Sequence, residues 1–212
     1  MRITVFGASG GIGGEIVRQG LAAGHEVTAV VRDPARLAAT GDRLEVFRSG
    51  LTDPEELRGA VAGRDAVLSG LGARGREDAR AGIATRLTVP VLRAMEAEGV
   101  RRLLVVSAAP LAPAAEREPL ADRAMMAVVS RVLKPVYADL RVLEGELARS
   151  ATDWTSVRPP RLLDKPLTGV YRTAVGRNPR GARQIGRADV AHAMLTMIDD
   201  PATVKQGVGV AY

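Results

Sequence analysis

The first residues of the chain constrain its fold more than any other segment. An apolar run at residues 3–6 leads directly into a glycine-rich stretch, residues 7–13, and the pattern after it is typical of a helix start. Gly7, Gly10 and Gly13 permit a tight turn, the approach of a pyrophosphate to bare backbone, and close packing of the helix on the strand. The helix N-terminus adds unpaired N–H groups and a partial positive charge. A strand, a glycine turn and a helix in this order predict a dinucleotide-binding site.

Length and composition favour a single domain over residues 1–212, which the glycine turn predicts to be an NAD(P)-binding domain. The chain has 212 residues, 46% of them hydrophobic, which is enough for one substantial core and short for two ordinary domains. The lack of cysteine excludes disulfides, thiolate metal sites and a cysteine nucleophile. The amino-terminal residues do not resemble a leader, and no apolar run has the length of a membrane span. We therefore expect a cytoplasmic protein without membrane contact.

The charge balance suits small anionic ligands better than nucleic acid. The formal net charge is +6, but the arginines are spread along the chain and aromatic residues make up only 3%, too few for a platform on which bases stack. A positive balance is compatible with an anionic cofactor and an anionic substrate. The two histidines, His25 and His192, lack carboxylates at ligand spacing, so we expect no metal site.

Apolar runs alternate with helical patterns along the whole chain. Strands are expected near residues 3–6, 26–31, 44–47, 65–69, 102–107, 154–158 and 208, with a short strand pair near 170–175 and 182–185. Helices are expected near residues 34, 53–62, 78–98, 120–150 and 188–198, the third of them bent or interrupted at Pro90. This alternation predicts an α/β fold, a Rossmann-like doubly wound parallel sheet that binds ligands at the carboxyl edge of its strands.

The loops at that edge supply the expected cofactor site. Its candidate residues are Gly7, Ser9, Gly10, Gly11, Ile12, Arg32, Arg36, Gly50, Leu51, Leu71, Gly72, Ala73, Arg74, Ser107, Pro159 and Pro160. Arg74 fits a phosphate-binding role and a solvated loop position equally well. A proline-punctuated loop, about residues 108–120, is expected to cover the acceptor site, and residues 159–212 to complete it.

The end of the second strand bears on the choice between NADP and NAD. An acidic residue at this place usually binds the ribose 2′-hydroxyl, whereas a 2′-phosphate calls for arginine. Here Arg32 follows the strand and Arg36 lies four residues on, so the two guanidiniums can clamp a phosphate. Asp33 is the competing signal, because its carboxylate can bind ribose hydroxyls. The pattern favours NADP(H).

Several segments together resemble a known family. The glycine turn, Val31-Arg32-Asp33, Pro159-Pro160 and residues 165–171 (Lys-Pro-Leu-Thr-Gly-Val-Tyr) are similar to the NADPH-dependent flavin reductase and biliverdin-IXβ reductase group, atypical short-chain dehydrogenases with NmrA-like relatives. The resemblance covers nearly the whole chain. It implies a single NADPH-binding domain that passes hydride to flavins or related conjugated acceptors.

The resemblance also implies positions near the nicotinamide, with two departures from the family pattern. Ser107 and Ala108 are expected beside the ring, and Pro159 and Pro160 are expected to hold its face. Arg161 stands where the flavin reductases carry histidine, and Ala108 where they carry a serine beside the acceptor. These departures weaken the transfer of the family's activity to this chain.

The proton-transfer pair of ordinary short-chain dehydrogenases is missing. Those enzymes use a tyrosine whose pKa is lowered by a lysine four residues later. Here Tyr137 is followed at that spacing by Arg141, Tyr171 by Val175, and Tyr212 ends the sequence. Hydride transfer to a flavin or quinone places less demand on a protein acid, because the charge is delocalised and solvent supplies protons.

Two residues remain as catalytic candidates, Ser107 and Arg161. Ser107 can donate to the carboxamide or the acceptor, or can satisfy local backbone only. Arg161 can stabilise negative charge on the reduced acceptor or bind its anionic tail. Glu144 and Glu146, on a helix rich in arginine, are expected to form surface pairs.

The sequence therefore predicts an NADPH-dependent oxidoreductase that acts on a flavin, a quinone or a related conjugated small molecule. Two alternatives stay open: an NADP-binding sensor of the NmrA-like type without turnover, and a biosynthetic enzyme that uses Tyr137 as its acid. A monomer or a weak homo-oligomer is expected, because no long exposed apolar helix demands a partner.

Overall fold

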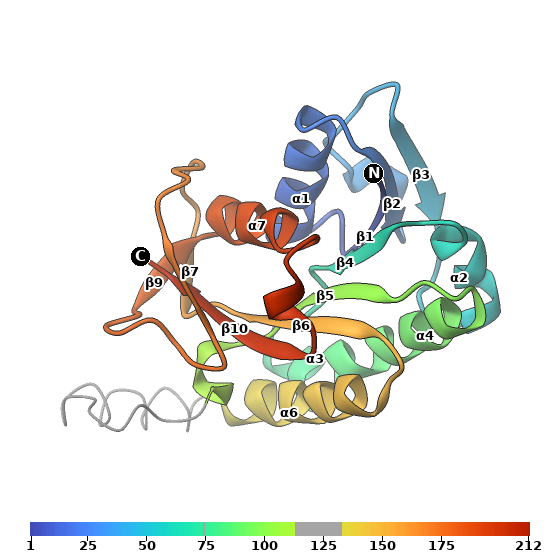
Figure 1. The fold of residues 1–212 in the computed structure, drawn as a ribbon. Coiled ribbons are helices and arrows are strands. Elements are labelled where there is room, and N and C mark those ends of the chain that lie inside the picture. The colour runs from blue at the N-terminus through green and yellow to red at the C-terminus, as the bar shows by residue number, and fades with distance from the viewer. Residues whose placement is uncertain (74, 113–132) are drawn as a thin grey trace.

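The computed structural model describes residues 1–73, 75–112 and 133–212. Eight strands form one sheet in the order β3-β2-β1-β4-β5-β6-β10-β8 (Figure 1). They are β1 (Arg2–Phe6), β2 (Glu26–Val31), β3 (Leu44–Arg48), β4 (Ala66–Ser69), β5 (Arg102–Val106), β6 (Asp153–Arg158), β8 (Arg172–Val175) and β10 (Gln206–Ala211). All neighbouring strands are parallel except β10 and β8. The mostly parallel sheet confirms the Rossmann-like α/β fold.

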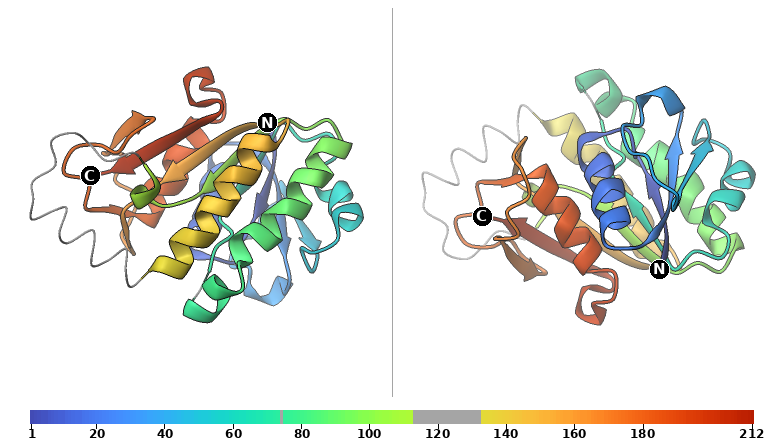
Figure 2. Two further views of the ribbon diagram at one scale, coloured as in Figure 1. Left: turned by 90° about the horizontal axis from the view of Figure 1, so that it is seen from below. Right: turned by 90° about the horizontal axis from the view of Figure 1, so that it is seen from above.

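Helices cover both faces of the sheet (Figures 1 and 2). On one face lie α1 (Gly11–Ala22) and α7 (Arg187–Thr196), and on the other α2 (Pro54–Val61), α4 (Ile83–Ala97) and α6 (Lys134–Arg149). Each face has its own core cluster, and residues in β1 alternate between the two, as the period of a strand requires. The helical stretch expected at 120–150 is described only from residue 133, and the loop expected at 108–120 only up to residue 112.

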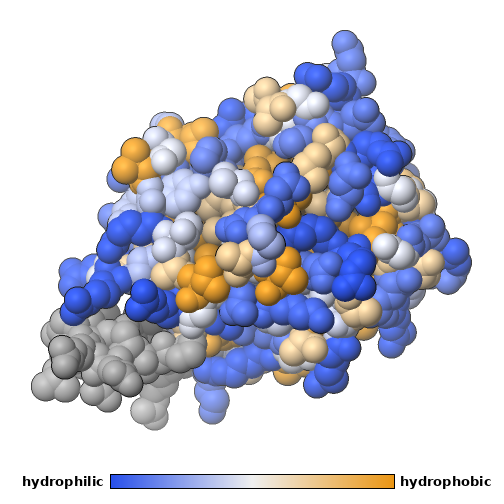
Figure 3. Space-filling view, in the orientation of Figure 1, coloured by the Kyte–Doolittle hydropathy of each residue, from blue (hydrophilic) through white to orange (hydrophobic). Residues whose placement is uncertain are grey.

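Short elements complete the fold at both edges of the sheet. They are α3 (Arg76–Arg80), three 3₁₀ turns named η1 (Pro34–Arg36), η2 (Ala109–Leu111) and η3 (Pro201–Thr203), and two strands, β7 (Arg161–Leu163) and β9 (Gln184–Gly186). The expected strand pair is wrong in its partners, because β8 pairs with β10 while β9 pairs with β7 in a separate parallel ribbon. Among the described residues, no helix is long and apolar enough to cross a membrane, and the face in Figure 3 is largely hydrophilic with scattered apolar side chains.

The helix expected at 78–98 is divided in two at Gly82 and runs without interruption through Pro90. Gly82 has a positive φ of 64°, a conformation that glycine adopts without strain, and it separates α3 from α4. Asp139 of α6 caps the new helix start: its Oδ2 accepts from the N–H of Ala84 at 2.9 Å and its Oδ1 from the N–H of Thr85 at 3.1 Å. Pro90 lies buried within α4.

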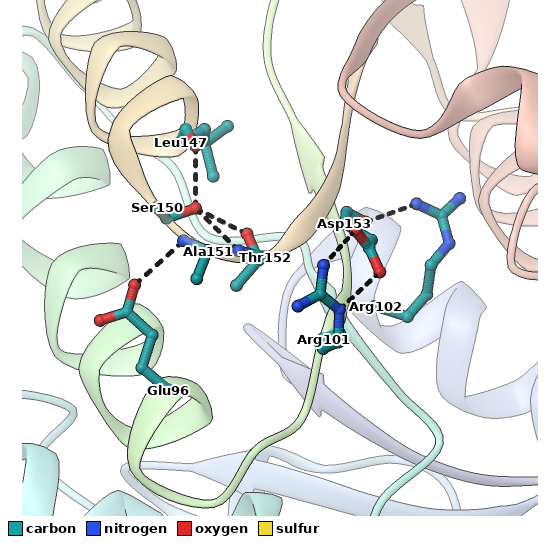
Figure 4. A network of polar contacts seen from close by, with 8 residues as sticks. All are labelled: Glu96, Arg101, Arg102, Leu147, Ser150, Ala151, Thr152 and Asp153. Carbon is teal, nitrogen blue, oxygen red and sulfur yellow. Dashed lines mark hydrogen bonds and ion pairs between the residues drawn. The ribbon is translucent and has the colours of Figure 1, made fainter.

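The amino edge of the sheet is held by an arginine network (Figure 4). Arg101 pairs with the carboxylate of Asp153, and Arg102 donates to the backbone carbonyl of Asp153. Arg102 also donates to the carbonyl oxygens of Met197 and Ile198 at the end of α7. Burial lowers the pKa of Arg102 below its ordinary value. These hydrogen bonds fasten the end of α7 to the start of β5.

Candidate functional site

The glycine turn is formed by contacts that exclude side chains. Gly7 has a φ of 74° and its carbonyl accepts from the N–H of Gly10 at 2.8 Å. A Cβ on Gly13 would lie 2.1 Å from that carbonyl oxygen, and one on Gly7 would lie 2.9 Å from the carbonyl carbon of Gly70. The ends of β1 and β4 and the start of α1 therefore meet backbone to backbone. Sequence reasoning missed Gly70, although it directly follows an apolar strand.

The start of α1 is open to an anion. Gly10 caps the helix without a side-chain hydrogen bond, and the first turn holds no acidic residue. Gly11 is exposed, Ser9 is half-buried and Ile12 anchors the turn in the core. Since the first N–H groups of a helix have no intrahelical acceptors, this end can bind the phosphates of a dinucleotide.

After β2, Asp33 is engaged in a helix cap, whereas Arg32 and Arg36 are exposed. Asp33 caps η1, because its Oδ1 accepts from the N–H of Ala35 at 3.1 Å. Arg32 and Arg36 are both exposed, and neither has an ion-pair partner within the described part of the chain. The cations are thus available to a ligand, whereas one carboxylate oxygen of Asp33 is already engaged.

The loop after β3 carries an unusual backbone conformation. Leu51 has a φ of 66° and is buried, and its N–H donates to Oγ of Ser49 at 3.0 Å. A left-handed conformation costs a leucine about 1 kcal/mol, so neighbouring contacts must hold it. Gly50 is exposed beside it. After β4, the expected residues Leu71, Gly72 and Ala73 continue along the same edge, and Arg74 lies outside the described residues.

The ends of β5 and β6 are joined by backbone hydrogen bonds. The N–H of Ser107 donates to the carbonyl of Val157 at 2.7 Å, and the N–H of Ala109 donates to the carbonyl of Pro159 at 2.9 Å. Ser107 and Pro159 are buried, and Pro160 is half-buried. The structure therefore brings together the residues that the family resemblance implies beside a nicotinamide.

A half-buried carboxylate lies directly beneath Ser107. Oε1 of Glu144 accepts from the hydroxyl of Ser107 at 2.8 Å, from the hydroxyl of Ser156 at 2.6 Å and from Nε of Arg158 at 2.9 Å. Its Oε2 accepts from Nη2 of Arg158 at 2.7 Å. The side chains of this ion pair are 12% and 16% exposed. The hydroxyl of Ser107 donates to Glu144, so the role expected from the sequence, donation to the carboxamide or the acceptor, is wrong. Its oxygen can still accept a hydrogen bond from a ligand.

Glu144 is therefore not in the surface pair expected from the sequence. Burial raises the pKa of its carboxyl, but the hydrogen bonds from Arg158, Ser156 and Ser107 and the charge of Arg158 outweigh burial, and the pKa falls below its usual value. Glu146 does form an exposed pair with Arg149. Glu144 stays ionised at neutral pH and is a poor proton donor. The alternation of Ser156 and Arg158 on one face of β6 was the available signal.

Tyr137 does not have the environment of a proton-transfer tyrosine. It is 6% exposed within the core beneath α6, and burial raises its pKa. A dehydrogenase tyrosine needs a lowered pKa. Arg141, one turn later, is exposed. His192 bonds the hydroxyl of Tyr171 at 2.6 Å, and the described residues contain no metal-binding group of three or more His, Cys, Asp or Glu.

The segment after the two prolines is strongly basic. Residues 161–187 contain seven lysines and arginines and one acid, Asp164, so the remaining 185 residues carry 23 of each sign. The whole formal net charge of +6 therefore lies in this segment, so the positive charge is not spread evenly along the chain as had been expected. Six of the seven cations are exposed, among them Arg161 at the start of β7.

Residues 166–169, the Pro-Leu-Thr-Gly part of the resemblance, are held by Asp189 of α7. This fully buried carboxylate accepts from the N–H groups of Thr168 at 3.0 Å and Gly169 at 2.8 Å and from the hydroxyl of Tyr212 at 2.7 Å. These bonds outweigh the effect of burial and lower the pKa of Asp189. The motif therefore folds back onto the start of α7. Sequence reasoning missed Asp189.

Comparison with known proteins gives sequence relatives over part or most of the chain. The chain is 28% identical over 210 residues to the uncharacterized sugar epimerase YhfK of Bacillus subtilis, covering 96% of this chain and 90% of that protein. A stretch of 71 residues is 46% identical to an uncharacterized protein of Schizosaccharomyces pombe, covering 32% of this chain and 23% of that protein. This chain thus spans less than a quarter of the length of the second relative.

A solved structure shares the fold, and a family model matches the sequence. A candidate NADH-flavin reductase from Streptococcus pneumoniae has a TM-score of 0.78 and 23% identity, with 100% of this chain and 99% of that one covered. The family model described as NAD(P)H-binding matches residues 7–201, from the glycine turn to beyond α7. The solved structure shows the expected Rossmann-like fold, and the family model shows that the chain belongs to the NAD(P)H-binding family, as the glycine turn predicted.

Proposed function

We propose that the protein is an NADPH-dependent oxidoreductase that reduces a conjugated small molecule such as a flavin or a quinone. The observation that carries the proposal is the chemistry at the ends of β5 and β6. There the hydroxyl of Ser107 donates to Glu144, while Tyr137 on α6 is buried with a raised pKa. Within the described residues, neither group suits protonation of a carbonyl oxygen, whereas a flavin or quinone accepts hydride without a strong protein acid.

The roles of the chain's own residues follow from their positions. The glycine turn and the start of α1 bind the diphosphate, and Arg32 and Arg36 bind the 2′-phosphate that distinguishes NADP from NAD. When bound, the reduced nicotinamide supplies the hydride. The oxygen of Ser107 accepts from the carboxamide, and Pro159 and Pro160 limit the position of the ring. These placements orient the reacting atoms, which is the main contribution of a protein to cofactor chemistry.

The charge of residues 161–187 supports an acceptor that carries an anionic group. Arg161 directly follows Pro160 and is exposed, so its guanidinium is available to a phosphate or carboxylate tail. Flavin mononucleotide and riboflavin differ only in such a phosphate and therefore make a matched pair of probes. The proposal requires the phosphorylated flavin to be the better substrate.

The experiment is steady-state oxidation of NADPH and NADH with flavin mononucleotide, riboflavin, a quinone and a linear tetrapyrrole. We expect turnover with NADPH to exceed that with NADH, and the double variant Arg32→Gln, Arg36→Gln to lose this preference. Arg161→Gln should raise the KM for flavin mononucleotide toward that for riboflavin and leave the riboflavin KM unchanged. Equal use of the two nucleotides by the wild type would reject the role of the arginine pair.

Two competing functions are separated by the same assays. An NmrA-like sensor, which the shortage of acid groups also favours, would bind NADP tightly and turn over none of the acceptors. An epimerase or ketoreductase that uses Tyr137 as its acid would lose activity in Tyr137→Phe. Full activity of that variant would support the flavin or quinone reductase.

A further inference from the structure

An arginine from the far end of the chain lies on the glycine turn. Arg187 is the first residue of α7, and Gly11 is the first residue of α1. A Cβ placed on Gly11 would be 2.6 Å from Cδ of Arg187 and 3.0 Å from its Nε. The stem of Arg187 therefore packs directly on the backbone of Gly11. Figure 1 shows α1 and α7 side by side on the same face of the sheet.

The position is electrostatically unfavourable for a cation without an anion. Both α1 and α7 present their N-termini here, and each carries a partial positive charge. The first turn of α1 holds no acid, and the acid of the first turn of α7, Asp189, is engaged by Thr168, Gly169 and Tyr212. Arg187 thus adds a third positive element to two helix ends that already repel it.

The described counter-ion of Arg187 is weakly held. Nη1 of Arg187 lies 2.5 Å from Oδ1 of Asp164, whose side chain is 88% exposed, while that of Arg187 is 32% exposed. Exposed ion pairs contribute little to stability because water and salt compete for both charges. A multivalent phosphate ligand can therefore replace this carboxylate at small cost.

We propose that Arg187 binds the diphosphate of the dinucleotide and that Asp164 is its counter-ion in the free protein. The glycine turn supplies N–H groups, and Arg187 supplies the positive charge and paired N–H donors that fit phosphate oxygens. On binding, the guanidinium exchanges the Asp164 carboxylate for the diphosphate, with no covalent change. This inference rests on the proposed function, since it assigns a further residue to the same nucleotide site.

The test measures the Kd of two probes by calorimetry. NADP⁺ contains both the diphosphate and the 2′-phosphate, whereas adenosine 2′-phosphate contains only the latter. Arg187→Gln should weaken NADP⁺ binding by about tenfold or more and leave adenosine 2′-phosphate binding unchanged. Asp164→Asn should strengthen NADP⁺ binding, because the competing anion is gone. Arg180→Gln, another exposed arginine of the basic segment, is the matched control and should change neither Kd.

Each outcome bears on a separate claim. Unchanged NADP⁺ binding in Arg187→Gln, or equal weakening of both probes, would overturn the diphosphate role. Weaker NADP⁺ binding in Asp164→Asn would overturn the role of Asp164 as a competing anion. If Arg187→Gln does not fold, Asp164→Asn, a change at an exposed side chain, still decides the question. Failure of the wild type to bind any nicotinamide dinucleotide would overturn the proposed function itself.

Discussion

At the scale of single residues, Glu144 shows how one side chain organises the site. It bonds Ser107 at the end of β5, Ser156 and Arg158 in β6, and stands on α6. Arg158 lies against Gly207 of β10, where a Cβ would be 2.3 Å from its guanidinium carbon. The carboxylate therefore joins two strands and a helix where the nicotinamide is proposed to bind. Its loss leaves a half-buried guanidinium without a counter-charge.

We expect Glu144→Gln to lower the free energy of unfolding by about 2 kcal/mol at neutral pH. The pKa of Glu144 is lower in the folded protein than in the unfolded chain, so its ionised form stabilises the fold above the unfolded pKa. This contribution is lost as the pH falls through the lower folded pKa. Urea unfolding of both proteins should therefore show a difference that shrinks below about pH 4.3.

The matched control for this change is Glu146→Gln on the same helix. Because Glu146 forms only an exposed pair with Arg149, this variant should change the free energy of unfolding by about 0.5 kcal/mol or less. If Glu144→Gln lowers the free energy of unfolding as little as Glu146→Gln does, the Arg158 guanidinium must be hydrated by water in the variant. A difference independent of pH would exclude the titration of Glu144 as its cause.

Two adjacent glycines of α1 make a second test at this scale. A Cβ on Gly13 would lie 2.1 Å from a backbone oxygen, whereas one on Gly14 would have its nearest neighbour at 3.4 Å. We expect Gly13→Ala to destabilise the protein by about 3 kcal/mol or more and to abolish nucleotide binding. Gly14→Ala should be neutral or stabilise by about 1 kcal/mol, since alanine favours helix. Thermal unfolding distinguishes the two, and similar effects would contradict the close packing of α1 on β1.

At the scale of elements, the helices are positioned by caps from distant parts of the chain. The start of α4 has no side-chain cap of its own, and Asp139 of α6 supplies one. The end of α7 is bound by Arg102 of β5, and its start holds residues 166–169 through Asp189. The strand at residues 26–31 could be predicted from its apolar run alone, because that pattern is local. The caps could not be predicted, because each capping residue and its partner become neighbours only after the sheet forms.

We expect Asp139→Ala to destabilise the protein by about 2 kcal/mol, because two N–H groups at the start of α4 lose their acceptor. Hydrogen exchange of the Ala84 and Thr85 amides should quicken more than that of amides elsewhere in α4. Arg141→Ala, at an exposed position of the same helix, is the control and should change stability by about 0.5 kcal/mol or less. Equal effects of the two variants would rule out a capping role for Asp139.

At the scale of the whole molecule, the charge is unevenly divided. The first 160 residues hold the glycine turn and the arginines after β2, while residues 161–187 carry an excess of positive charge equal to that of the entire chain. A field of one sign beside a site raises the local concentration of oppositely charged ligands and weakens with salt.

With NADPH saturating, we expect the KM for flavin mononucleotide to rise with ionic strength and that for riboflavin to stay constant. If both KM values rise equally with ionic strength, the salt effect does not act on the phosphate of flavin mononucleotide.

The sequence by itself determined the parallel α/β sheet, the glycine turn and the edge at which the site lies, because these depend on local apolar periodicity and on residues within a few positions of each other. It also placed Ser107, Pro159 and the arginines after β2 at that edge. Tertiary structure alone decided that Glu144 bonds Ser107, that Asp189 holds residues 166–169 and that Arg187 lies on Gly11. These contacts join residues far apart in the chain, and only the packing of helices on the sheet selects them among many possible charge pairs.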